Sequence, residues 1–365
     1  TESDEMDLAR ANISWIRKDG EHISQINRML ERHRLAPIFS TADNHNISVE
    51  SLACHELSGC DEPELISVIM TVYGRDEYLD VAIDSILQQT YSKLELIIVD
   101  DCSTDDAFEY LKQRQADDPR IKAFQVDNNG GTYLAKNYGL TQSTGDFITF
   151  MDSDDWTHPQ RLERQHVSLQ SNTEVKAVWH SNFRIDENGD IIYKGSGAIR
   201  KACISLMIKR EVHDRVGFFD SLRVGADTEF IERIVASYGD GALLYDSLPT
   251  MFMMQLSDSL TGGGRFHISW RSITDERFAH HCSFRAWHRK IVHRGESPFV
   301  PHPLRVRPFT APEEMFSGAV QWRDGDEKFS SLVADRDSHW WAEKTNIWQR
   351  KVSNKMAGRK YARLV

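Results

Sequence analysis

The chain has 365 residues, enough to bury a full α/β core with one or two smaller flanking regions. Its composition, 40% hydrophobic and 27% charged, is ordinary for a globular protein, and no apolar run is long enough to span a bilayer. The formal net charge of −11 argues against nucleic acid as the main partner, because a phosphate backbone attracts clustered Lys and Arg.

The start of the chain and its cysteines favour the cytoplasm. Residues 1–5 are acidic and lack the apolar core of a secretory signal, and the chain could be a fragment of a longer protein. The five cysteines are scattered and form no CxxC pair, which favours reduced thiols. A zinc site on Cys54, His55 and Cys60 is disfavoured, because this cluster supplies too few ligands at the usual spacing.

The first 62 residues are expected to be a helical N-terminal extension and a linker. Apolar residues recur at near-helical spacing over 6–35, and polar, poorly patterned sequence follows. From residue 63 short apolar segments alternate with helical ones, which is the signature of a mostly parallel sheet with helices on both faces. The expected strands are 65–72, 94–99, 121–126 and 147–151, and the expected helices are 77–89, 105–116 and 131–142.

A second half is expected over 158–264. Its predicted elements are a helix from Pro159 to about residue 169, a hairpin over 175–193, a strand over 203–208, a helix over 227–238, and short strands at 243–245 and 251–256. A glycine-rich loop over 261–264 ends it. Residues 265–365 are predicted to be a helical, basic C-terminal region. Its cations could contact an anionic acceptor or a membrane surface, although a solvated helix face is the commoner explanation.

Polar side chains gather where three predicted strands end, which is where open parallel sheets bind ligands. Asp152 and Asp154 lie in an acidic run, and carboxylates packed this tightly repel one another unless a Mg²⁺ or Mn²⁺ ion lies between them. The alternative is an acidic turn that caps the next helix. Asp100 and Asp101 could bind a base or ribose through their carboxylates; the alternative is that Ser103 or Asp105 caps the next helix. Neither GxGxxG nor GxxxxGK[ST] is present, which disfavours dinucleotide oxidoreductases and P-loop enzymes.

Several motifs are spaced in a fixed order along residues 66–155. In chain order they are ISVIMTVY at 66–73, SILQQTY at 85–91, ELIIVDDCSTD at 95–105, NGG at 129–131, AKN at 135–137 and FMDSDD at 150–155. Together they resemble the nucleotide-binding half of inverting family 2 glycosyltransferases, which implies a GT-A type, Rossmann-like α/β fold with a DxD metal motif. The resemblance implies a nucleotide-binding half over 63–157 and an acceptor half over 158–264.

The resemblance also implies roles for individual residues. Thr71, Tyr73 and Asp100 would contact the nucleobase, most often uracil in this family. Asp152 would lie by the ribose or the metal, and Asp154 would hold the metal. Lys136 could meet the diphosphate, or could simply be a solvated helix position.

The acceptor side resembles the family at RVGFFD, 215–220, and at GADTEF, 225–230, where the family places its catalytic base. Asp227 takes that position. The family's Glu-Asp pair is here Ala226-Asp227, so the first acid is missing while Glu229 supplies another nearby; we favour Asp227. Residues 259–262 resemble a loop near the acceptor. Trp156, Trp179, His158 and His180 are weaker candidates, because large aromatic residues are more often core.

The expected function is therefore metal-dependent, inverting transfer of a hexosyl or N-acetylhexosaminyl group. The donor would be a nucleotide-sugar, most often a UDP-sugar, and the acceptor a glycan hydroxyl, in bacterial surface-polysaccharide synthesis. The chain would be cytoplasmic or peripheral at the inner face of the membrane, through the basic C-terminal region. The alternatives are a glycan-binding or scaffold relative and, less favoured, a nucleotidyltransferase, which usually needs a Gly-rich basic loop after its first strand.

Overall fold

The computed structural model describes residues 3–41, 48–193, 197–255 and 274–316. All of them belong to one compact unit, residues 1–321. Within this part of the chain no helix is long and apolar enough to cross a membrane. The predicted loop over 259–262 and the end of the predicted C-terminal region lie outside the described residues.

The nucleotide-binding half is built on four parallel strands in the order β5 (Ile121–Gln125), β4 (Leu94–Asp100), β3 (Ile66–Val72) and β6 (Phe147–Asp152). Every residue of β3 and β4 is buried. Strands covered on both faces read as continuous apolar runs. All four were predicted to within one residue at each end.

The sheet continues from β6 into the acceptor half and is mixed there. Its strands are β10 (Met207–Lys209), β8 (Ala177–Asp186), β11 (Leu243–Gln255), β7 (Trp156–Thr157) and β9 (Arg200–Lys201). β10 is antiparallel to both β6 and β8, so β8 runs in the same direction as β6. β11 is parallel to β8, and β7 and β9 add antiparallel edges.

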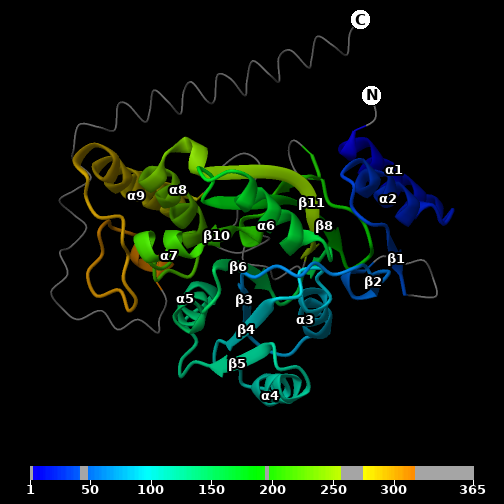
Figure 1. The fold of residues 1–365 in the computed structure, drawn as a ribbon, viewed down its shortest axis with the longest axis horizontal. Helices are drawn as coiled ribbons and strands as arrows, with labels where there is room; N and C mark the ends of the chain where they lie inside the picture. The colour runs from blue at the N-terminus through cyan, green and yellow to red at the C-terminus, as the bar shows by residue number, and fades with distance from the viewer. Residues whose placement is uncertain (1–2, 42–47, 194–196, 256–273, 317–365) are drawn as a thin grey trace, which may run out of the picture. The chain divides into compact units, whose positions relative to one another are not determined.

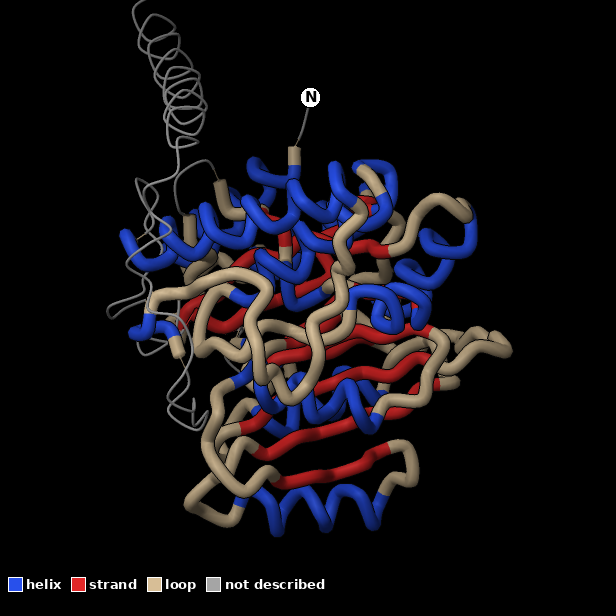
Figure 2. Tube along the Cα trace, turned by 90° about the vertical axis from the view of Figure 1, so that its left-hand side faces the viewer, coloured by secondary structure: helices blue, strands red, loops and turns tan. Residues whose placement is uncertain are grey.

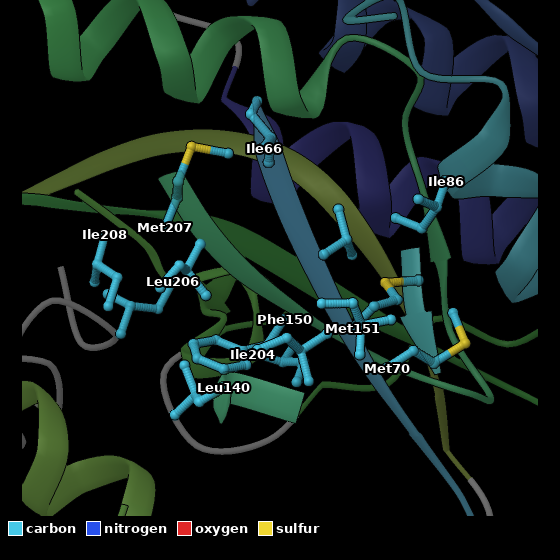
Figure 3. Packing of buried hydrophobic residues seen from close by; sticks show 14 of the residues in the cluster. Ile66, Met70, Ile86, Leu140, Phe150, Met151, Ile204, Leu206, Met207 and Ile208 are labelled. Atoms are coloured by element: carbon cyan, nitrogen blue, oxygen red, sulfur yellow. The ribbon is translucent and has the colours of Figure 1, made fainter. Parts of the chain in front are cut away.

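Helices cover both faces, as predicted (Figures 1 and 2). They are α3 (Leu79–Leu87), α4 (Ala107–Asp117), α5 (Thr132–Gln142), α6 (Arg161–Ser171), α7 (Arg210–Val216), α8 (Ala226–Tyr238) and α9 (Asp275–Arg294). α5 lies so close to β3 and β4 that a Cβ on Gly139 would lie 2.5 Å from Ile69. A large apolar cluster, which includes Met70, Phe150 and Met207, joins the two halves (Figure 3).

The single amphipathic stretch expected over 6–35 is two packed helices, α1 (Asp4–Arg17) and α2 (His22–Arg32). The chain turns between them at Lys18, which has φ 55° and ends α1, and at Gly20, with φ 82°. A two-stranded sheet, β1 (Ile38–Ser40) with β2 (Leu52–Cys54), follows.

The N-terminal hairpin packs on the acceptor half rather than standing apart from it. Leu8 and Ile26 are fully buried in an apolar cluster with Phe183 of β8 and Phe252 of β11. The predicted boundary at residue 62 stays a prediction, but the apolar stripe of the hairpin has a defined partner.

Other predictions for the acceptor half need correction. The second strand of the expected hairpin is reduced to an isolated bridge between Ile185 and Ile191. The expected strand over 203–208 is a 3-10 turn, Cys203–Ser205, followed by β10. The two short strands expected near the end are one strand, β11, whose register shifts around Pro249 because proline cannot donate to the ladder.

Candidate functional site

The carboxyl ends of three strands bring the predicted donor-binding residues to one edge of the sheet. Thr71 at the end of β3 pairs with Asp152 at the end of β6, and Val72 pairs with Asp100 at the end of β4. Because these strands are parallel and in register, the three residues lie at the same edge of the sheet, where such sheets bind ligands.

Asp100 is fully buried and held from two directions. Its carboxylate accepts hydrogen bonds from the Gln125 amide at 2.7 Å and from the Ser103 backbone N–H at 3.2 Å. The Thr71 hydroxyl lies 2.8 Å from the hydroxyl of Thr132, the first residue of α5. Tyr73, in contrast, is 62% exposed. This edge of the sheet therefore combines a buried, hydrogen-bonded carboxylate with an exposed aromatic side chain.

The residue after Asp100 anchors the loop that leads into α5. The two carboxylate oxygens of Asp101 accept the backbone N–H groups of Gly130 and Gly131 at 2.8 and 2.7 Å. Gly131 has φ 84°, a conformation that favours glycine. Burial raises the pKa of Asp101. Asp101 was predicted, together with Asp100, to bind a base or ribose, but both of its carboxylate oxygens are bound to the Gly-Gly loop instead.

The acidic loop after β6 has three carboxylates that differ in burial and in their partners. Asp152 is partly exposed and pairs with the buried Lys136 of α5 at 3.1 Å. Burial, and then the charge of Asp152, raise the pKa of Asp154 to about 7. Asp155 is buried and accepts the Met254 backbone N–H at 3.0 Å, and burial and Asp154 raise its pKa. Asp155 thus ties the loop to β11, which leaves Asp152 and Asp154 for a ligand.

These two carboxylates fit a hard divalent cation. Asp154 lies in surroundings that disfavour its charge, and a cation would relieve that cost. No group of three or more His, Cys, Asp or Glu side chains suited to a metal occurs within the described ranges. Mg²⁺ is commonly bound through one or two carboxylates plus substrate phosphates, so two protein ligands are compatible with it.

Asp227 is the second residue of α8 and lies two residues after Gly225, the N-cap residue, which has a φ of 80°. Burial, and then the charge of Asp227, raise the pKa of Tyr133 on α5, so the two side chains face each other. The loop before α8 is fixed to α5, because the Asn137 side chain donates to the Phe219 carbonyl and accepts its N–H, both at 2.9 Å. Asp227 is therefore held against the helix that carries Lys136.

Glu229, the second acid predicted as catalytic, lies against Arg233 and α9. It is fully buried, 3.1 Å from the Arg233 guanidinium and 2.9 Å from His288 of α9. Arg233 also donates to the carbonyls of Val216 and Phe218. Glu229 thus joins α8 to α9, and these contacts favour Asp227 over Glu229 as a base.

The weaker candidates are mostly core residues. His158 is buried between the Ala36 carbonyl, 3.0 Å from its Nε2, and the Gln160 N–H. His180 is buried with its Nδ1 2.9 Å from the Thr250 hydroxyl. Trp156 packs edge-on against Phe252. Cys54 and Cys60 are free thiols.

The strand order and the acids at the strand ends agree with the GT-A type α/β fold that the sequence predicts. Residues 67–230 match the family model for Glycosyl transferase family 2. That match places a family 2 glycosyltransferase domain over these residues.

Curated relatives agree with this assignment. The chain is 40% identical over 132 residues to the O-antigen biosynthesis glycosyltransferase WbnJ of Escherichia coli, covering 35% of this chain and 50% of WbnJ. It is 38% identical over 101 residues to the putative teichuronic acid biosynthesis glycosyltransferase TuaG of Bacillus subtilis, covering 28% and 40%. The chain thus spans about half the length of the curated relatives it matches. Among solved structures, S. aureus TarS in complex with UDP has 19% identity and a TM-score of 0.42, covering 53% of this chain and 61% of that one.

Proposed function

We propose that the protein is a metal-dependent, inverting glycosyltransferase that moves a hexosyl or N-acetylhexosaminyl group from a UDP-sugar to a glycan hydroxyl. The observation that carries this proposal is the placement of Asp152 and Asp154 at one strand end, with Asp227 held against α5, inside a domain of the matched family.

The donor would lie across the carboxyl ends of β3, β4 and β6. Asp100, with its carboxylate already held in place, would accept from the base, and Thr71 and Tyr73 would line the same pocket. Mg²⁺ or Mn²⁺ held by Asp152 and Asp154 would neutralise charge on the diphosphate. Lys136, paired with Asp152, adds a second positive charge beside it.

The transfer itself needs a base on the face opposite the leaving group. Asp227 would take the proton of the acceptor hydroxyl as the acceptor oxygen bonds to the anomeric carbon. The bond from that carbon to the phosphate oxygen breaks, and UDP leaves with the electron pair. A single displacement through an oxocarbenium-like state inverts the anomeric configuration.

The acceptor is proposed to be a bacterial surface polysaccharide or its precursor. The matched relatives are named for O-antigen and teichuronic acid biosynthesis, which supports this class. We place the chain in the cytoplasm, with contact to the inner membrane face through the basic C-terminal region. In the described part of that region, Lys290, His293 and Arg294 lie exposed at the end of α9.

The test is binding and slow hydrolysis of UDP-, GDP- and CMP-sugars with and without Mn²⁺. Asp154→Asn is expected to abolish metal-dependent donor binding, whereas Asp227→Asn should keep binding and lose transfer by 10²-fold or more. Asp117→Asn removes an exposed carboxylate of α4 and should change neither. If no nucleotide binds to the folded wild type, the enzyme proposal fails and a scaffold role is favoured.

A further inference from the structure

Two aromatic residues and one lysine form a small polar platform in the acceptor half. Trp179 of β8 pairs in register with Tyr245 of β11, and Ser181 of β8 pairs with Lys201 of β9. The Lys201 ammonium lies 5.0 Å from the centre of the Trp179 ring and 4.8 Å from that of Tyr245. The Ser181 hydroxyl is 2.6 Å from the Tyr245 hydroxyl and fixes that ring.

The pairing register places this platform on the active-site face of the sheet. Met207 of β10 pairs with both Thr149 of β6 and Val178 of β8, so those three side chains share one face. Because successive residues alternate, Asp152 of β6 and the platform's Trp179 both lie on the opposite face.

Ring contacts identify that opposite face. Phe150 of β6 shares it with Asp152, and its ring lies 5.2 Å from that of Phe219, in the segment that leads to Asp227. Cys203, two residues after Lys201, is partly buried. Burial, and then the charge of Asp227, raise the pKa of its thiol, while the charges of Lys201 and Lys136 lower that pKa. The platform therefore adjoins the base.

Among the described residues, no acidic side chain pairs with the ammonium of Lys201. Lys201 is exposed, and within the described ranges no carboxylate lies at ion-pair distance from it. Its contacts there are the two ring faces, which orient a cation without cancelling its charge. Tyr245 is 36% exposed and offers apolar surface beside the ammonium. An amphipathic ligand with one negative group matches this combination.

We infer that Lys201, Trp179 and Tyr245 form an acceptor subsite that selects a sugar bearing a negative group, either a carboxylate or a phosphate. The ammonium pairs with that group while the sugar ring packs on Tyr245, and a hydroxyl of the same or the neighbouring sugar reaches Asp227. The inference rests on the proposed function and names the acceptor class of that site.

The experiment compares wild type with Lys201→Ala, Lys201→Glu and the control Lys290→Ala, which removes an exposed cation from α9. Acceptors are matched oligosaccharides that are neutral, uronic-acid-containing or phosphate-bearing. Donor hydrolysis without acceptor is measured first. We expect Lys201→Ala to raise KM tenfold or more for the acidic acceptors, to leave kcat and donor hydrolysis within about twofold, and to spare the neutral acceptor. Lys201→Glu should lose more, and Lys290→Ala nothing.

The two acidic acceptors distinguish a carboxylate from a phosphate ligand. The acceptor whose affinity falls in Lys201→Ala carries the negative group that the subsite binds. Equal effects on neutral and acidic acceptors, or no effect on either, overturn the inference. If wild type turns over no donor, the proposed function fails separately. In that case calorimetric binding of the same acidic oligosaccharides to wild type and Lys201→Ala still decides whether the subsite exists.

Discussion

The N-terminal helix α1 is hydrogen-bonded to the segment that leads to Lys201. Removing these hydrogen bonds tests whether α1 keeps that segment in place. The Glu5 carboxylate of α1 accepts the backbone N–H groups of Ala198 and Ile199 at 2.9 and 3.0 Å, just before β9. Asn12, about two turns further along the same face of α1, exchanges two hydrogen bonds with the backbone of Ile191. Glu5→Ala removes the first pair and leaves the second.

The expected magnitude follows from the hydrogen bonds lost. A hydrogen bond to a charged group contributes about 1.5–3 kcal/mol net, and two that share one partly exposed carboxylate are not additive. We expect Glu5→Ala to lower the free energy of unfolding by about 2 kcal/mol, in urea titrations. If this loss falls on the segment before β9, about 2 kcal/mol changes the equilibrium constant between its docked and detached states about thirtyfold. KM for the acceptor should rise while donor hydrolysis stays the same.

A double-mutant cycle separates this contact from general damage. A Cβ on Gly197 would lie 2.2 Å from a Glu5 carboxylate oxygen. Gly197→Ala should therefore destabilise wild type but cost clearly less in the Glu5→Ala background. Glu31→Ala, which removes an exposed carboxylate of α2, should stay within about 0.5 kcal/mol of wild type. Additive effects, or equal losses for Glu5→Ala and Glu31→Ala, would refute the clamp.

Three further predictions concern stability and donor binding. Burial lowers the pKa of His158 from 6.5 to about 4, so as the pH falls the unfolded chain binds this proton before the folded chain does. The free energy of unfolding should therefore decrease from pH 6.5 to 4, by up to about 3 kcal/mol. In urea titrations, His158→Gln should reduce this pH dependence by about one proton. Gly217→Ala should lower Tm by several degrees, because φ is 74° and a Cβ would lie 2.2 Å from the Val300 carbonyl oxygen. Asp101→Ala should weaken UDP binding in calorimetry about tenfold, because the Gly130 N–H loses its acceptor.

Each of the three has a matched control. His293→Gln changes an exposed histidine and should keep the pH slope. Gly241→Ala adds a Cβ with no atom within 4 Å and should leave Tm within about two degrees. Asp127→Ala removes an exposed carboxylate beside the same loop and should leave UDP binding unchanged. If a variant and its control behave alike, the contact assigned to that variant does not have the stated effect.

The nucleotide-binding half was predictable because its signals are local. β3 and β4 are buried along their whole length, so their apolar runs marked them directly. The acceptor half was less predictable because its strands depend on distant partners. β11 continues through Pro249 only because β8 lies beside it, and the turn at Lys18 that divides α1 from α2 interrupts an apolar pattern that stays helical on both sides.

The two acids of α8 show why assigning site residues needs the structure as well as the sequence. Asp227 and Glu229 are two residues apart, which on a helix puts them about 200° apart and on different faces. Spacing alone could not say which face looks to the donor, since that depends on α9, 59 residues further along the chain from Glu229 at His288. Arg233 and α9 engage Glu229, whereas the Asp227 carboxylate lies on the side of α8 where α5 carries Tyr133. The choice of Asp227 over Glu229 as the proposed base therefore depends on α9, a helix that the family motifs do not include.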